Sequence, residues 1–538
     1  MNLSGGDRSP TVKAILIVTL LVWVGFVAVR LSAPSDLMSR DQERVASYVL
    51  DVVEGGNWLW QEDTAGNFAS KPPLYNWLAA LPVIATGELD RLTLSFPSWF
   101  ATVISCLLLV AIAGRWFSRS TALWVALVML SCQLGIRQVI LVRSDTLFQM
   151  FVLLGVFFAL RACLDGKSWW PFWLAAIGSV MTKGPLGLLF SSLGLVALLW
   201  QRRSKGETGV TLHRRGLVGG ALIFIAVPVL WLLVADQESG GRAIAKLLGD
   251  EFFGHSLGER SVVGASWTDH LNPIGWFFTR LAPMSWLAIF ALVKNLRRPS
   301  EDPEERFVER FLFCWLIGGL IILCAASHHR FVHLLALMPP AALLGARQLA
   351  TIASARSPMI ALLALSIVLP FASLYLNVID GNSPRIIRSE EARRFAMRAK
   401  KITGRSAKIE FFRAPTAVQV HLSRFMEPLN DGGVGEILAD NEPVWIITAE
   451  EDLLRRLAGE GGSDGINVVL RTPYEDEYLV LSLNNAMRHS IAEFVPSLPV
   501  VHWPLFLLLV TSGSGGIVLL TLLTGRRVAR GQVDSTSV

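Results

Sequence analysis

Long apolar stretches separated by short polar segments are the main pattern along the chain. A helix needs roughly 17–25 predominantly apolar residues to cross the hydrocarbon core of a bilayer. Apolar runs that approach this length occupy residues 14–32, 94–114, 121–136, 146–160, 168–182, 184–201, 216–235, 271–293, 311–327, 331–346, 357–379 and 501–523. The pattern therefore predicts an α-helical polytopic membrane protein with about twelve transmembrane helices.

The composition agrees with this prediction. Hydrophobic residues make up 52% of the 538 residues and charged residues only 17%, whereas soluble proteins carry about 25% charged residues. These values exclude a soluble enzyme. The net charge of +6 is small for this length, and the basic residues lie in short loops, so nucleic acid is not expected as a partner. The five cysteines lie in apolar runs and form no CxxC pair, which argues against a disulfide framework.

The distribution of basic residues between the apolar runs predicts the orientation of the chain. Clusters of arginine and lysine follow the runs that end at residues 114, 201, 293 and 523. Cytoplasmic loops of membrane proteins are enriched in these two residues. With the N-terminus inside and the first run retained as a helix, residues 33–93 form a long first outer loop, and residues 380–500 also lie outside.

Residues 380–500 differ in kind from the rest of the chain. Charged residues are more frequent there, and short β-type runs occur at residues 408–412, 443–448, 466–470 and 478–483, with helical patterns between them. This alternation predicts a small extracytoplasmic α/β domain. The predicted division is a transmembrane domain at residues 1–379, the α/β domain at 380–500, and a last transmembrane helix with a cytoplasmic tail at 501–538.

Polar clusters on the predicted outer side are candidates for function, because ionisable groups at membrane depth are costly. Asp41 and Arg44 follow the first helix, and Lys71 precedes two prolines. Arg143 and Asp145 lie at the outer end of the fourth apolar run, and Lys183 lies at a polar break between two short runs. A structural explanation stays open for each, since Asp41 could cap a helix and the cations could extend toward lipid headgroups.

One further outer cluster combines His255, Glu259 and Arg260 with His329 and Arg330. Histidine and glutamate can ligate zinc, but this spacing matches no strong motif. His255, Glu259 and His329 are therefore only weak candidates for a metal site. No cofactor is expected as certain, and a divalent metal stays an open alternative.

The polar motifs follow one another in a distinctive order. The order is Asp-x-x-Arg at residues 41–44, Lys-Pro-Pro-Leu-x-x-Trp at 71–77, Arg-Ser-Asp at 143–145, Thr-Lys-Gly-Pro at 182–185, and a basic patch before a proline-terminated helix. This order resembles the C-type membrane glycosyltransferase superfamily. The most similar branch is that of bacterial aminoarabinose transferases and protein O-mannosyltransferases. The resemblance covers residues 14–350 and extends only loosely to the C-terminal part.

The resemblance implies transfer of a sugar from a polyprenyl-phosphate carrier to a lipid or protein acceptor. The reaction would take place on the outer face of the bacterial plasma (inner) membrane. Asp41 and Asp145 match the acids of the first and second outer loops, and Lys71 matches the lysine near the lipid phosphate. The departures from the family pattern are Gln42 for glutamate, Val45 for tyrosine, Ser70 for an acid and Phe331 for tyrosine. They leave metal binding and the choice of donor open.

We therefore expect an inverting glycosyl transfer with Asp41 as the general base and Asp145 orienting the acceptor or sharing the developing positive charge. Lys71 would be the main support of the leaving phosphate. Further contributions are expected from Arg44, Arg143, Lys183, Arg260 and Arg330. The alternatives are a secondary transporter and a non-catalytic envelope scaffold. An enzyme would place Asp41, Lys71 and Asp145 around one outer cavity, whereas neither alternative requires this convergence.

Overall fold

The computed structural model describes residue 37 and residues 39–493, apart from short gaps. The gaps lie at residues 132, 204–214, 254–266, 327–328, 353–383, 405–406, 427–428, 439–441, 455–465, 475–476 and 485–491. The predicted membrane helices at 14–32, 357–379 and 501–523 lie outside the described residues. His255, Glu259 and Arg260 lie outside them as well.

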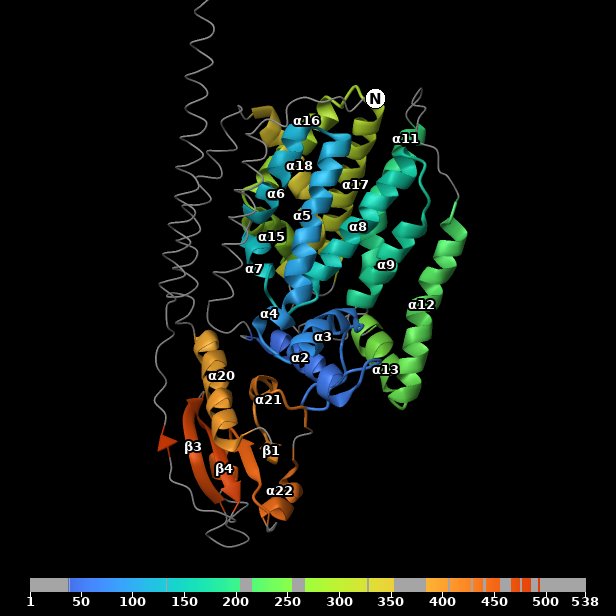
Figure 1. The fold of residues 1–538 in the computed structure, drawn as a ribbon. Coiled ribbons are helices and arrows are strands. Elements are labelled where there is room, and N and C mark those ends of the chain that lie inside the picture. Colours follow the sequence, from blue (N-terminus) through green and yellow to red (C-terminus); the bar gives the residue numbers. More distant parts are fainter. Residues whose placement is uncertain are drawn as a thin grey trace, which may run out of the picture.

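A bundle of helices forms the larger part of the described chain (Figure 1). Four described helices are long and apolar enough to cross a membrane, namely α5 (Phe96–Trp116), α8 (Asp145–Leu164), α12 (Leu217–Glu238) and α17 (Pro303–Ala325). The expectation of a mostly helical, polytopic membrane protein is confirmed, whereas the number of about twelve spans stays a prediction.

Shorter helices complete the bundle. They are α6 (Arg119–Ser131), α7 (Gln133–Gln138), α9 (Trp170–Lys183) and α18 (Met338–Ile352). Helix α8 packs against both α5 and α9, and α18 packs against α6. The bundle interior is mainly apolar, and its largest side chains, such as Trp315 and Phe311, are completely buried.

Two of the predicted apolar runs are broken helices. The run at residues 271–293 consists of α15 (Asn272–Arg280) and α16 (Met284–Arg297), and the chain bends by 104° between them. The run at 184–201 consists of α10 (Leu186–Ser192), a 3₁₀ turn η2 (Leu193–Val196) and α11 (Ala197–Arg203). A proline precedes both α16 and α10. Proline lacks a backbone N–H and clashes with the preceding turn, so the run at residues 271–293 bends before Met284 instead of forming one straight helix.

A layer of short helices lies across one end of the bundle (Figure 1). It consists of α2 (Arg40–Leu50), a π-helical turn η1 (Asp51–Gly55), α3 (Leu74–Thr86) and α4 (Arg91–Leu94). Ala46, Val49 and Leu50 form the buried face of α2 and share a core with Tyr75 and Val83 of α3. Burying this apolar face holds α2 over the end of α8.

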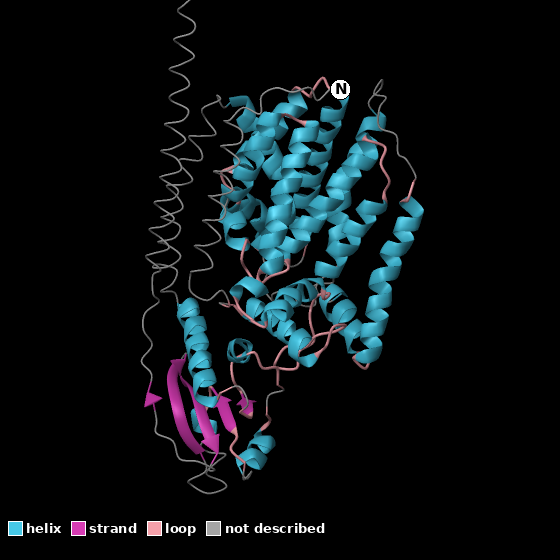
Figure 2. Cartoon of the chain, in the orientation of Figure 1, coloured by secondary structure: helices cyan, strands magenta, loops and turns pink. Residues whose placement is uncertain are grey.

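A five-stranded sheet with flanking helices forms the C-terminal part (Figure 2). Its strands are β1 (Ile409–Phe412), β2 (Trp445–Thr448), β3 (Ile466–Tyr474), β4 (Glu477–Asn484) and β5 (Ala492–Glu493). The strand order is β1-β2-β4-β3-β5; β1 is parallel to β2 and β5 to β3, while β4 is antiparallel to both its neighbours. The helices are α20 (Pro384–Thr403), α21 (Thr416–Leu422) and α22 (Asp431–Leu438). Helix α20 packs on the sheet through Phe395.

The C-terminal part contacts the layer of short helices through α21. Val420 of α21 lies in the same apolar core as Val49 of α2. The Thr64 hydroxyl donates to the Thr416 hydroxyl at 3.0 Å, and the Ser389 hydroxyl donates to the carbonyl of Leu37 at 2.8 Å. The sheet and its helices therefore adjoin the element that carries Asp41.

Candidate active site

Asp41 lies in the first turn of α2 and forms ion pairs with two arginines. Its Oδ2 is 3.0 Å from Nη1 of Arg330 and 3.4 Å from Nη2 of Arg143. The Asp41 side chain is 45% exposed. Within the described residues its Oδ1 has no hydrogen-bond or ion-pair partner, so one oxygen of this exposed carboxylate is available to a substrate.

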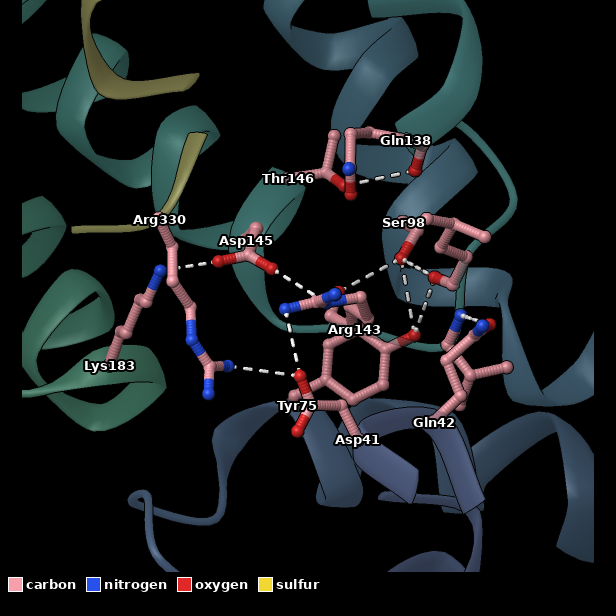
Figure 3. A network of polar contacts seen from close by, with 12 residues as sticks. Asp41, Gln42, Tyr75, Ser98, Gln138, Arg143, Asp145, Thr146, Lys183 and Arg330 are labelled. Carbon is pink, nitrogen blue, oxygen red and sulfur yellow. Dashed lines mark hydrogen bonds and ion pairs between the residues drawn. The ribbon is translucent and has the colours of Figure 1, made fainter. Parts of the chain in front are cut away.

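Asp145 opens α8 and is, by contrast, almost completely buried. Its Oδ2 lies 3.0 Å from Nε of Arg143, and its Oδ1 forms an ion pair with Lys183. Arg143 therefore joins the two carboxylates, with one edge of its guanidinium on Asp41 and Nε on Asp145. Figure 3 shows this chain of charges from Lys183 through Asp145 and Arg143 to Asp41 and Arg330.

The position of Lys183 follows from the end of α9. Gly184 has φ of +89°, a conformation in which glycine is favoured, and Pro185 cannot continue the helix. The helix therefore ends at Lys183, and its side chain reaches Asp145, which precedes it by 38 residues. The Thr-Lys-Gly-Pro motif thus brings a cation to the start of the neighbouring helix.

Lys71 lines the same cleft as Asp41, Arg44, Arg143 and Thr182. Its ammonium makes no hydrogen bond or ion pair with any described residue. Burial lowers its pKa to about 8; nearby Asp145 opposes this shift, whereas the cations Lys183 and Arg143 add to it. A half-buried cation that has no partner among the described residues and lies beside other cations is suited to binding an anion.

Four cations lie at or near the cleft. The described carboxylates beside Lys71, Arg143, Lys183 and Arg330 are those of Asp41 and Asp145. The remaining candidate, Arg44, donates its Nε–H to Asp63 at 3.2 Å. Arg44 is therefore paired with a carboxylate of its own.

Three buried polar residues hold the backbone that precedes Asp145, and none of them was a predicted site residue. The Ser98 hydroxyl donates to the carbonyl of Leu141 at 2.6 Å, and the Tyr75 hydroxyl is 3.1 Å from that of Ser98. The amide N–H of Val142 donates to the side-chain oxygen of Gln42 at 3.4 Å. A serine within an apolar run and a tyrosine just after two prolines were the only sequence signals for these contacts.

Asp63 is a further buried residue that the sequence did not single out. Its carboxylate accepts the backbone N–H groups of Ala65 and Asn67 at 3.0 and 2.9 Å, in addition to Arg44. The turn-forming sequence Asp-Thr-Ala-Gly-Asn at residues 63–67 is the signal that could have identified it.

Of the three weak metal candidates, the structure describes only His329. Its ring lies 5.1 Å from that of His270. Within the part of the chain that the structure describes, no group of three or more His, Cys, Asp or Glu residues could hold a metal ion.

Comparisons with known proteins agree with the motif order. A sequence profile of the family described as dolichyl-phosphate-mannose-protein mannosyltransferase matches residues 70–231, which include Lys71, Asp145 and Lys183. The chain is 26% identical over 313 residues to an undecaprenyl phosphate-alpha-4-amino-4-deoxy-L-arabinose arabinosyl transferase of Pseudomonas savastanoi pv. phaseolicola. This alignment covers 56% of the chain and 55% of the relative, so it spans about half the length of each protein.

Solved structures of ArnT from Cupriavidus metallidurans have a similar fold. The structure bound to undecaprenyl phosphate gives a TM-score of 0.66 at 14% identity, covering 88% of this chain and 98% of ArnT. The apo structure gives 0.63 at 13% identity, covering 87% and 97%. The comparisons together confirm the resemblance to the C-type membrane glycosyltransferase superfamily, on its aminoarabinose transferase branch.

Proposed function

We infer that the protein is a membrane glycosyltransferase that moves a sugar from a polyprenyl-phosphate donor to a lipid or protein acceptor. The observation that carries this inference is the convergence of Asp41, Lys71 and Arg143 on one cleft at the end of the helical bundle. The cleft combines an exposed carboxylate with a partnerless lysine, which are the two groups that such a transfer requires. The likeness to proteins named for lipid-phosphate-linked sugars supports the same reaction class.

Asp41 is assigned as the general base of a single displacement. Its free Oδ1 would accept the proton of the acceptor hydroxyl while the acceptor oxygen forms a bond to the anomeric carbon. The bond from this carbon to the phosphate oxygen breaks in the same step, and its electron pair leaves with the polyprenyl phosphate. One displacement inverts the configuration at the anomeric carbon. The ion pairs with Arg143 and Arg330 orient the carboxylate for this role.

The leaving phosphate gains negative charge as the bond breaks and therefore needs cations close by. Lys71 is assigned as the principal one, because it lines the cleft and has no other partner in the described structure. Arg330 and Lys183 would add to the attraction at longer range.

Asp145 takes a different role from the one expected from the sequence. Both of its oxygens are occupied, by Arg143 and by Lys183, and the side chain is only 1% exposed. We therefore assign it to holding these two cations in place. Direct contact of Asp145 with the acceptor is not part of the proposal.

The location of the reaction follows from the charge distribution of the loops. We propose about twelve spans in the bacterial plasma membrane, with the cleft and residues 380–500 outside. Residues 380–500 would form an extracytoplasmic domain next to the cleft. The transporter and scaffold alternatives are less favoured, since Asp41, Arg143 and Asp145 gather at helix ends beside one cleft.

A transfer assay tests the proposal. Purified protein would be incubated with a panel of polyprenyl-phosphate sugars and with lipid and peptide acceptors, and the products would be analysed by mass spectrometry. The expected result is transfer from at least one donor, lost in the Asp41→Asn variant. Absence of transfer from every donor, together with normal activity of an ArnT control under the same conditions, would refute the proposed function.

A further inference from the structure

The segment that carries Arg143 has little structure of its own. Residues 139–144 connect α7 to α8, and within them the N–H of Arg143 donates to the carbonyl of Leu141, two residues back, at 2.9 Å. Such a three-residue turn is weak by itself. Leu141 and Val142 are nevertheless buried, at 4% and 1% exposure. Groups from other helices must therefore hold this turn in place.

Ser98 of α5 and Tyr75 of α3 supply these groups. The Ser98 hydroxyl lies 2.6 Å from the carbonyl of Leu141 and 3.1 Å from that of Arg143. The Tyr75 hydroxyl lies 3.1 Å from the Ser98 oxygen, 3.1 Å from the carbonyl of Leu94 and 3.4 Å from that of Leu141. Figure 3 shows both hydroxyls beside the backbone of the turn.

The number of protons that each hydroxyl can donate separates the roles of Ser98 and Tyr75. Each hydroxyl has a single proton to donate. The shortest contact indicates that Ser98 donates to Leu141, which leaves the Ser98 oxygen free to accept from Tyr75. Ser98 thus holds the turn directly, whereas Tyr75 donates its single proton to Ser98 and so supports it.

We propose that Ser98 and Tyr75 are positioning residues that set the place of Arg143, and through it the relation between Asp41 and Asp145. The proposal rests on the proposed transfer reaction and adds two residues that do not touch the substrate. Arg143 is the only described residue with ion pairs to both carboxylates, so a displaced turn would move the orienting group of Asp41. A misplacement of about 1 Å can reduce an enzymatic rate roughly a hundredfold.

The test compares Ser98→Ala and Tyr75→Phe with a matched control on the same helix. Ser105 is two turns further along α5, is equally buried, and its hydroxyl has no partner within the described structure. Ser105→Ala therefore removes the same atom without touching the turn. The measurements are kcat, the Kd for undecaprenyl phosphate, and hydrogen–deuterium exchange of the peptide spanning residues 139–145.

In Ser98→Ala we expect hydrogen–deuterium exchange of this peptide to be about tenfold faster, because the loss of one hydrogen bond destabilises the closed turn by about this factor. The value of kcat should fall roughly 10- to 100-fold, with the Kd changed less than about twofold because Lys71 is not involved. Tyr75→Phe should show the same pattern to a smaller degree, and Ser105→Ala should match the wild type.

Unchanged exchange in Ser98→Ala would overturn the proposal. So would faster exchange with unchanged kcat, an equal loss of kcat in Ser105→Ala, or a loss of donor binding as large as the loss of kcat. Inactivity of the wild type would instead refute the proposed reaction. The exchange measurement needs no activity, so the support of the turn by Ser98 would still be decided.

Discussion

Removing the Lys71 ammonium is the perturbation with the most specific expected outcome. In the structure Lys71 is half-buried and lines the cleft, and its ammonium has no partner among the described residues. A charged hydrogen bond to a phosphate contributes about 1.5–3 kcal/mol. Lys71→Ala should therefore weaken the binding of undecaprenyl phosphate by roughly 10- to 150-fold. Lys71→Arg keeps the charge with a different geometry and should retain part of the affinity.

The pH dependence provides a second, independent signature. Burial and the neighbouring cations lower the pKa of Lys71 to about 8, so the charged form is present below this pH and is lost as the pH rises through it. At pH 9.5 about 3% of the free protein would be protonated at Lys71. If only this form binds, the affinity should fall about 30-fold between pH 7 and 9.5. Lys71→Arg should lack this decrease, because arginine stays protonated.

Binding of undecaprenyl phosphate to purified protein in detergent is the assay, measured at several pH values. Lys246→Ala is the matched control, because Lys246 also lies on the predicted outer side but pairs with Asp250 and does not line the cleft. Equal affinity of the wild type and Lys71→Ala would refute the assignment. If the affinity of Lys71→Arg also decreased at high pH, a group other than Lys71 would be responsible for the pH dependence.

Three further predictions concern the two carboxylates and the orientation. Asp41→Asn keeps the shape of the side chain but cannot accept a proton, so kcat should fall roughly 10²–10⁴-fold while undecaprenyl phosphate still binds; near-normal turnover would contradict this. Asp145→Asn leaves Arg143 and Lys183 without their buried partner and should cost about 3–5 kcal/mol of stability, seen as a lower Tm. Asp165→Asn is the control, because Asp165 is ion-paired at a more exposed site, and it should cost less than about 1 kcal/mol of stability. Equal losses of stability in the two variants would argue against a special role of Asp145. A cysteine at Glu88 should react with an impermeant reagent added outside intact cells, whereas labelling only after lysis would reverse the proposed topology.

Much of the architecture could be predicted from the sequence alone, because membrane helices are visible as long apolar runs along the chain. A backbone in hydrocarbon must satisfy its own hydrogen bonds, so a long apolar run can hardly be anything but a helix. The runs over α5, α8, α12 and α17 follow this rule. The bend between α15 and α16 was less predictable, because a proline can either kink a helix or end it, and the surrounding packing decides which.

The members of the candidate site were also recognisable as single residues. Asp145 and Lys183 lie at the ends of apolar runs, and Asp41 and Lys71 lie in the first predicted outer loop; ionisable groups near membrane depth are costly and therefore informative. Regular crossing of the membrane predicts that such groups lie on the same side. Neither argument can say which charge contacts which, because pairing depends on how the helices pack and on side-chain reach.

Only the tertiary structure decided the division of roles between the two carboxylates. In the sequence Asp41 and Asp145 are equivalent acids beside an arginine, yet one is half exposed and the other buried between two cations. The structure likewise decided that Ser98 and Tyr75, unremarkable in an apolar pattern, support the turn before Asp145. Hydrogen bonds act over a few ångströms, between groups that here lie 23 to 66 residues apart. No local sequence pattern indicates contacts between residues so far apart in the chain, and only the packing of α3, α5 and α8 brings these groups together.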